Sequence, residues 1–302
     1  MTDAAVTCVL AARDKLGEGV IWDAVAGVLW WVDVPMPSLL HRLDPATGRH
    51  DNWLMPEMVM SISPLADGRL LIASHHGLNL FAPGDGILKR IAAPEADKPL
   101  NRANDGGTDP QGRFWFGTMM NNIAPDNTYL AVPEAVGSLY RVGPDLIPVR
   151  MDGQVGIANS IAWSPDGGTM YFADTLAATI YTYDFDPAAG AIWNRRVFAA
   201  PEGYGYPDGS CVDAEGYLWN ARWEGGCVLR FAPDGTIDRV LKVPASRVTC
   251  CAFGGADLGT LYITTSRLHL TDAELADQPD AGGLFAHVPG VRGQQPNRFK
   301  MN

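Results

Sequence analysis

A structural unit of about 40 to 55 residues recurs along the whole chain, the spacing typical of β-propeller blades. Each copy has a polar turn with Asp or Gly, an aliphatic and aromatic run, a break, and a second run ending near Asp-Pro or Pro-Asp-Gly. Runs of this kind, bounded by turn residues, predict short strands. The turn-and-strand signals lie at Asp23–Asp33, Asp67–Ala73, Asp109–Thr118, Asp166–Asp174, Asp213–Ala221 and Asp257–Thr265.

The repeat predicts an all-β fold, a six-bladed β-propeller with four-stranded antiparallel blades that forms a single domain over residues 1–302. A two-domain β-sandwich is the alternative, and the unbroken repeat argues against it. Because the strand at Val6–Ala11 precedes the first turn signal, we expect it to complete the last blade and close the ring. One short helix is expected at Thr271–Ala276, with Thr271 as N-cap and Glu274 three residues on.

The longest departure from the repeat is a polar, proline-containing insertion at Met119–Val136. Insertions in repeat folds map to loops on one face, which is often the binding face. A tolerated surface loop is the other interpretation, and the sequence does not separate the two.

Composition excludes several classes of function. The 302 residues carry a net charge of −11, with no basic patch typical of nucleic-acid binding. No apolar run is long enough for a transmembrane helix, and the N-terminus lacks the pattern of a secretory signal. The five cysteines have neither zinc-site spacing nor an even number. We therefore expect thiols in a reducing cytoplasm, no nucleic-acid or membrane partner, and a monomer or small homo-oligomer.

Polar side chains recur at a matched distance before the turn glycines. Glu18 lies nine residues before Gly27, whereas Asn104, Asn159 and Asp208 lie eight before Gly112, Gly167 and Gly216. Equivalent positions in a ring of repeats converge on the axis, so we expect these four side chains to meet in the channel. Turn residues that cap their own backbone are the plain alternative. The second and sixth units break the pattern, with Met60 and Cys251 at the corresponding positions.

The chemistry of this set favours a divalent cation. Glu18, Asn159 and Asp208 offer two carboxylates and a carboxamide oxygen, ligands that suit Ca²⁺, Mg²⁺ or Mn²⁺ and that Zn²⁺ and Fe²⁺ also accept. Three protein ligands leave positions open for water and substrate. We predict one divalent cation, with its identity among these five left open.

Other catalytic patterns are absent from the sequence, including nucleophile elbows, phosphate loops and zinc-protease helices. The only histidine cluster, His75-His76, could face the channel or make ordinary contacts at a strand end. Adjacent Cys250 and Cys251 are interpreted as buried thiols, with a redox role as the alternative. Candidate cavity walls are Trp22, Met60, Met119, Tyr206 and Trp223, although aromatic residues in such positions are more often part of the core.

Four ordered segments resemble signatures of the SMP-30/gluconolactonase/regucalcin-like family: LGEGVIWD, NRANDGGTDPQGRFWFGTM, IANSIAWSPDGGTMYFADT and YPDGSCVDAEGYLWNARW. The resemblance runs from about residue 9 to the segment Val291–Gly293. It implies a six-bladed propeller with one divalent cation in the channel and hydrolysis of sugar-acid lactones, with some members acting on other esters.

The resemblance also assigns roles by position. Glu18, Asn159 and Asp208 match the family's cation ligands, and Asp208 also matches its candidate general base. Arg102 and Asn104 match residues that hold substrate oxygens, and their donor and acceptor groups suit that task. One position departs: some members carry a glutamate just after the Gly-Thr-Met strand, and this chain has no acid there. Asn121 and Asn122 stand there instead, and we expect Asn122 to contact substrate.

The leading functional hypothesis is a metal-dependent lactonase that opens a sugar-acid lactone, an aldonolactone, to the aldonic acid. In this hypothesis the cation polarises the carbonyl and Asp208 takes a proton from the attacking water. Two alternatives remain. One is an aryl-ester or phosphotriester hydrolase on the same metal site, and the other is a propeller that binds a metal or a protein without catalysis.

Overall fold

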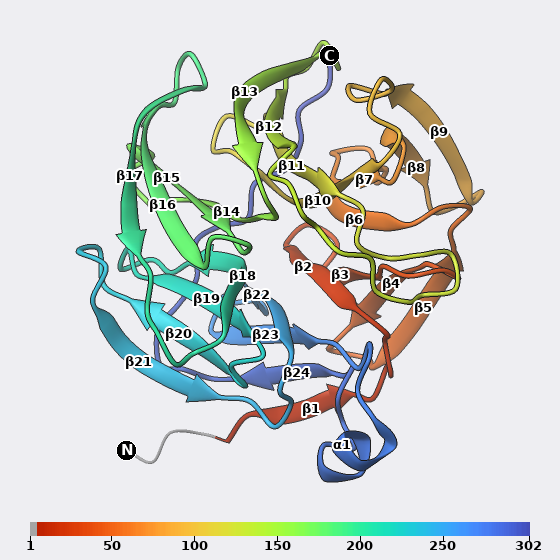
Figure 1. Ribbon diagram of the computed structural model, residues 1–302, viewed down its shortest axis with the longest axis vertical. Coiled ribbons are helices and arrows are strands. Elements are labelled where there is room, and N and C mark those ends of the chain that lie inside the picture. The colour runs from red at the N-terminus through yellow and green to blue at the C-terminus, as the bar shows by residue number, and fades with distance from the viewer. Residues whose placement is uncertain (1–4) are drawn as a thin grey trace.

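The computed structural model describes residues 5–302, which form a ring of six β-sheets around a central axis (Figure 1). Each sheet has four antiparallel strands. The innermost strand of each sheet packs against the innermost strands of the two neighbouring sheets. These innermost strands therefore surround the axis. The predicted six-bladed propeller is therefore confirmed.

The strand bounds follow the repeat. The first three blades comprise β2 (Gly17–Asp23), β3 (Val28–Asp33), β4 (Leu39–Asp44), β5 (Arg49–Leu54); β6 (Val59–Pro64), β7 (Leu70–Ser74), β8 (Gly77–Ala82), β9 (Ile87–Ala92); and β10 (Asn101–Thr108), β11 (Phe114–Met120), β12 (Gly137–Val142), β13 (Pro148–Val155). The next two comprise β14 (Ala158–Trp163), β15 (Thr169–Asp174), β16 (Thr179–Asp186), β17 (Ala191–Ala199); and β18 (Tyr206–Val212), β19 (Leu218–Trp223), β20 (Cys227–Phe231), β21 (Ile237–Lys242).

The sixth blade joins the two ends of the chain. It contains β22 (Val248–Gly254), β23 (Thr260–Thr265), β24 (Leu284–His287) and, as its outermost strand, β1 (Thr7–Leu10). The N-terminal strand thus closes the ring as expected, two residues shorter than the predicted run. The one helix among the described residues, α1 (Asp272–Asp277), begins at N-cap Thr271 with the predicted capping box to Glu274. No helix in the described range 5–302 has the length and apolarity to cross a membrane.

Buried tryptophans hold the second strands in place. Trp115 of β11 and Trp219 of β19 are fully buried, and their indole N–H groups donate to Asp109 and Asp213 at 3.0 and 2.9 Å. Each aspartate directly follows the innermost strand of its blade, so each hydrogen bond links the end of that strand to the second strand of the same blade. Burying a large apolar side chain contributes about 1.5–3 kcal/mol, and the bond satisfies the indole's one donor.

The two ends of the channel differ. At one end, the insertion between β11 and β12 folds over the mouth, where Asn127 donates to the Met36 carbonyl at 2.8 Å and its own carbonyl lies 2.7 Å from His269 Nε2. At the other end, the C-terminal segment runs across the back of the ring (Figure 1). It is fastened there by Gln294 to the Trp163 carbonyl at 3.0 Å and by the Phe299 N–H to the Pro64 carbonyl at 3.0 Å.

Candidate metal and substrate site in the central channel

A β-bulge interrupts each innermost strand near its start. Bulges break the alternation of side chains and re-aim them, which is why they recur beside active sites. Glu18 and Asn159 are the last paired residues before the bulges of β2 and β14. Asn104 and Asp208 lie inside the bulges of β10 and β18. The matched spacing to the turn glycines therefore marks the bulges. Relative to the bulge, Glu18 and Asn159 lie one residue earlier than Asn104 and Asp208.

The two units that break the pattern also have bulges. Met60 lies in the bulge of β6 but is buried in the core, 3% exposed. In β22 the bulge contains Thr249, and Cys251 lies beyond it, paired with Ile263. The prediction that Cys251 occupies the position equivalent to Asn104 or Asp208 is therefore wrong. The distance from the bulge to the turn glycine is different in the sixth unit.

All the predicted site residues border one cavity of about 360 Å³ at the insertion end of the channel. Thr175 and His269 also border this cavity, and most of the remaining lining residues are apolar. The lining residues are Leu16, Glu18, Arg102, Asn104, Met119, Asn122, Ile123, Tyr129, Ile157, Asn159, Thr175, Leu176, Tyr206, Asp208, Trp223, Leu268 and His269. Because Asn122, Ile123 and Tyr129 belong to the insertion, it forms part of the cavity wall and is not only a surface loop.

A chain of hydrogen bonds connects the polar floor of this cavity. Arg102, 3% exposed, donates through Nη1 to Asn104 Oδ1 and through Nη2 to Asn122 Oδ1, both at 2.7 Å. Asn104 Nδ2 then donates to Asn159 Oδ1 at 3.1 Å. Asn159 Nδ2 donates to Thr175 Oγ1 at 2.7 Å. The guanidinium thus fixes the orientation of two carboxamides that border the cavity.

The carboxyl groups of Glu18, Asp105 and Asp208 are crowded together and largely buried. Burial, and then the charge of Asp105, raises the pKa of Glu18 to about 8. Burial and the charges of Glu18 and Asp105 hold the pKa of Asp208 well above its usual range, and the two carboxyls share a hydrogen bond. Burial also raises the pKa of Asp105 to about 6 and lowers that of Arg102 to about 10. Arg222 is also buried and interacts with Asp208, so three carboxyls lie near two guanidinium groups and remain in excess.

This imbalance fits a divalent cation, because buried charges need an opposite charge or a metal. Within residues 5–302 no three His, Cys, Asp or Glu side chains form a metal-holding group by themselves. The candidate ligand set accordingly needs the carboxamide of Asn159 beside the carboxylates of Glu18 and Asp208. An all-oxygen set of this type suits hard cations.

Several other expectations can be compared with the structure. Met119, Tyr206 and Trp223 line the cavity as expected, whereas Trp22 and Met60 do not. Trp22 borders a hollow of about 190 Å³ at the far end of the channel, together with Cys250, Cys251 and Asp105. His75 and His76 form the turn after β7 and line a separate hollow of about 310 Å³ that Arg102 also borders. Burial lowers the pKa of His75 to about 4, so its ring is neutral.

The sequence interpretation missed three residues that support the site. Asp105 follows Asn104 directly and its Oδ2 accepts from the Ile161 N–H at 3.3 Å. Thr175 donates from Oγ1 to the Pro207 carbonyl at 2.6 Å, which links the strands of Asn159 and Asp208. His269 borders the cavity and contacts the insertion. The position of Asp105, between Asn104 and the turn glycines, was the only signal available from the sequence.

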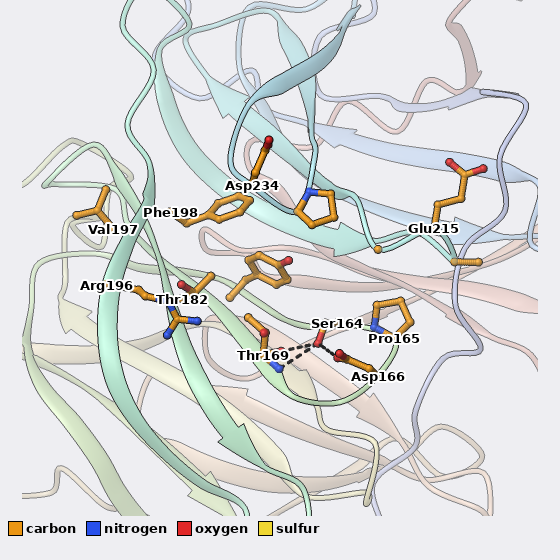
Figure 2. Close-up of a pocket in the computed structure, with 14 residues that line it drawn as sticks. Ser164, Pro165, Asp166, Thr169, Thr182, Arg196, Val197, Phe198, Glu215 and Asp234 are labelled. Atoms are coloured by element: carbon orange, nitrogen blue, oxygen red, sulfur yellow. Dashed lines mark hydrogen bonds between the residues drawn. The ribbon is translucent and has the colours of Figure 1, made fainter.

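A larger hollow of about 540 Å³ lies between the fourth and fifth blades on the hairpin side (Figure 2). Its polar groups serve the turns. Ser164 Oγ donates to Asp166 Oδ1 at 2.5 Å and accepts from the Thr169 N–H at 3.0 Å, and Arg196 pairs with Asp184. Hydrogen bonds to Ser164 and backbone N–H groups lower the pKa of Asp166, as expected for a turn carboxylate. This hollow does not gather the unpaired carboxyls that distinguish the channel.

The chain is similar to known proteins over most of its length. A family model described as SMP-30/Gluconolactonase/LRE-like region matches residues 16–267. The chain belongs to this family. Relatives include regucalcin of Xenopus laevis, 32% identical over 302 residues with 99% of each chain covered. L-arabinolactonase of Azospirillum brasilense is 37% identical over 298 residues, with 97% and 95% covered. Pentonolactonase of Haloferax volcanii is 38% identical over 263 residues, with 86% and 85% covered.

Among solved structures, a calcium-binding regucalcin from Agrobacterium tumefaciens has a TM-score of 0.91 and 33% identity, covering 99% of this chain and 98% of its own. The family similarity thus extends over all six blades, including β1 and the C-terminal segment. It agrees with the resemblance drawn from the four sequence segments.

Proposed function

We propose that the chain is a divalent-cation-dependent lactonase that hydrolyses lactones of sugar acids. The observation that carries the proposal is the oxygen set of Glu18, Asn159 and Asp208 on one cavity with an excess of buried carboxyl groups. Relatives named as arabinolactonase and pentonolactonase support the substrate class. We treat the closed ring as one functional domain.

The cation, when bound, would polarise the lactone carbonyl and stabilise the negative charge that develops on its oxygen. Calcium is a reasonable first candidate because the similar Agrobacterium protein is named as calcium-binding. The other four divalent cations fit the same oxygens, and the proposal does not choose among them.

Asp208 is the proposed general base. Its carboxyl borders the cavity, where it could reach a water beside the substrate, and burial with the neighbouring carboxyls raises its pKa above the ordinary value. It would take a proton from the water that attacks the carbonyl carbon. As the ring C–O bond breaks, the same carboxyl would return the proton to the leaving ring oxygen, which releases the hydroxy acid. Glu18 shares a hydrogen bond with Asp208 in the cation-free protein, and both carboxyls would be ionised when they bind the cation.

Arg102, Asn104 and Asn122 are the proposed substrate-binding groups. Arg102 donates to both carboxamide oxygens at 2.7 Å, so the guanidinium orients Asn104 and Asn122. The carboxamide nitrogen of Asn122 is free to donate to a ring hydroxyl. Holding the ring in one orientation converts binding into a higher rate, because a misplacement of about 1 Å can cost about 100-fold.

An aryl-ester hydrolase is the second candidate, favoured by the apolar rim of the cavity. Tyr129, Leu176 and Tyr206 line it and remain 62%, 49% and 44% exposed. A rim of this kind would also accept a flat aromatic group. The polar floor still favours a hydroxylated ring, so the lactonase remains the primary proposal.

A substrate panel tests the proposal. The full chain, stripped with a chelator and reloaded with each divalent cation, is assayed on aldonolactones, on phenyl acetate and on a phosphotriester. The highest kcat/KM on an aldonolactone supports the lactonase. A higher value on phenyl acetate or the phosphotriester identifies the second candidate, and no turnover of any substrate indicates a binding protein.

The location and partners form part of the same proposal. None of the five cysteines, all within the described residues, forms a disulfide. Free thiols suit the reducing conditions of the cytoplasm. We therefore propose a cytoplasmic enzyme whose partner is a small lactone.

A further inference from the structure

Two innermost strands pass through left-handed backbone directly after a proposed cation ligand. Gly19 follows Glu18 with φ of 59°, and Ser160 follows Asn159 with φ of 58°. Glycine adopts such angles freely, whereas a residue with a Cβ is strained there. A strained residue persists where its surroundings hold it, and such residues cluster at functional sites. The left-handed backbone of Ser160 therefore needs a structural reason, whereas that of Gly19 does not.

The buried hydroxyl of Ser160 supplies that explanation. Ser160 has no exposed surface, and its Oγ donates to the Asp208 carbonyl at 2.5 Å. The same Oγ accepts from Asn220 Nδ2 at 3.0 Å and lies 2.8 Å from Ser210 Oγ. Asn220 Nδ2 also lies 3.0 Å from the Asp208 carbonyl. The hydroxyl thus joins the fourth blade, which carries one proposed ligand, to the backbone of another ligand in the fifth.

Both sides of this link are themselves fixed. On the side of the fourth blade, Asp105 Oδ2 accepts from the Ile161 N–H at 3.3 Å and restrains the bulge. On the side of the fifth blade, Arg222 Nη1 donates to Asn220 Oδ1 at 2.8 Å, and both side chains are fully buried. A group held this firmly transmits position rather than adapting to a ligand.

We infer that Ser160 is a positioning residue whose hydroxyl fixes the Asp208 backbone relative to Asn159, so that their oxygens face the same point of the cavity. The inference rests on the proposed function, because it takes Asn159 and Asp208 as ligands of a divalent cation. Groups that orient metal ligands typically contribute about 10- to 100-fold to metal affinity.

Two substitutions separate the hydroxyl from the backbone strain. Ser160→Gly and Ser160→Ala both remove the hydroxyl, but only glycine relieves the left-handed strain. Asn194→Gly is the matched control, because Asn194 is exposed and also left-handed, with φ of 55°. The full-length, chelator-stripped proteins are titrated with Ca²⁺ and with Mn²⁺ by calorimetry, and thermal unfolding is followed in chelator.

The expected result is a similar rise in Kd, at least about tenfold, for both Ser160 variants. In chelator, Ser160→Gly should unfold at a higher temperature than Ser160→Ala, while Asn194→Gly keeps the affinity of the wild type. The inference is overturned if Ser160→Gly binds cation like the wild type, or if affinity follows unfolding temperature across the variants. A wild-type chain that binds neither cation overturns both the inference and the proposed function.

Discussion

Replacing Glu18 with glutamine should stabilise the cation-free protein at neutral pH while destroying its cation site. Burial and the charge of Asp105 raise the pKa of Glu18 from 4.5 to about 8. A carboxyl with a raised pKa in the folded state stabilises the fold below its unfolded pKa, and that contribution is lost as the pH rises toward the folded value. Glutamine does not titrate, so Glu18→Gln avoids this loss.

The magnitude follows from the shift. At pH 7, which is about 2.5 units above the unfolded value, the loss is ~3 kcal/mol at ~1.4 kcal/mol per unit. Because the carboxyl borders the cavity and is screened there by water, we expect a gain of about 1–3 kcal/mol for Glu18→Gln. At pH 5 the difference should fall below about 1 kcal/mol, because most of the loss occurs at higher pH.

Urea denaturation in chelator at pH 5 and pH 7 measures this difference. Repeating it with saturating cation should stabilise the wild type, by ~2.7 kcal/mol at a concentration of 100 Kd, and leave Glu18→Gln unchanged. A variant less stable than the wild type at pH 7, or a difference independent of pH, would refute the electrostatic reasoning.

Further predictions concern the same cavity. Asp208→Ala should abolish lactone hydrolysis and weaken cation binding together, which an activity assay and calorimetry on one sample will show; retention of either property contradicts its double role. Arg102→Lys removes the guanidinium that donates to both Asn104 and Asn122. We therefore expect kcat/KM to fall by about 10- to 100-fold while cation affinity changes little. Equal losses of kcat/KM and of cation affinity would instead indicate that Arg102 supports the cation site. Protons compete with the cation for Glu18, so cation affinity should rise with pH up to about 8 and then level off; calorimetry between pH 6 and 9 checks this, and an affinity that falls over that range would contradict it.

The fold was predictable because its signals are local. Alternating apolar runs and turn glycines recur in every blade, and the ring follows from their number and spacing. The capping box of Thr271 and Glu274 lies within a single helical turn, which is why even the short α1 was found. The strand near the N-terminus could be placed because it precedes the first turn signal, and the structure pairs it with the sixth blade.

The site was only partly predictable because its geometry depends on bulges and on contacts between blades. Spacing to the turn glycines brought out Glu18, Asn104, Asn159 and Asp208, since all four lie at or in a bulge. It could not show that Ser160 adopts a left-handed conformation and reaches the next blade, 48 residues away in sequence.

The cavity walls show the same limit. Tyr206 and Trp223 line the cavity, but Trp22 faces the far end of the channel and Met60 lies in the core. The direction in which an aromatic or methionine side chain points depends on the bulge in its strand. The repeat pattern does not carry that information.

The central claim is that Glu18, Asn159 and Asp208 hold one divalent cation on which lactone hydrolysis depends. The most direct measurement is aldonolactone turnover by chelator-stripped protein during stepwise addition of cation, with bound metal quantified in parallel. The account predicts negligible turnover without cation and a linear rise that ends at one equivalent. Full turnover by the metal-free protein would contradict it.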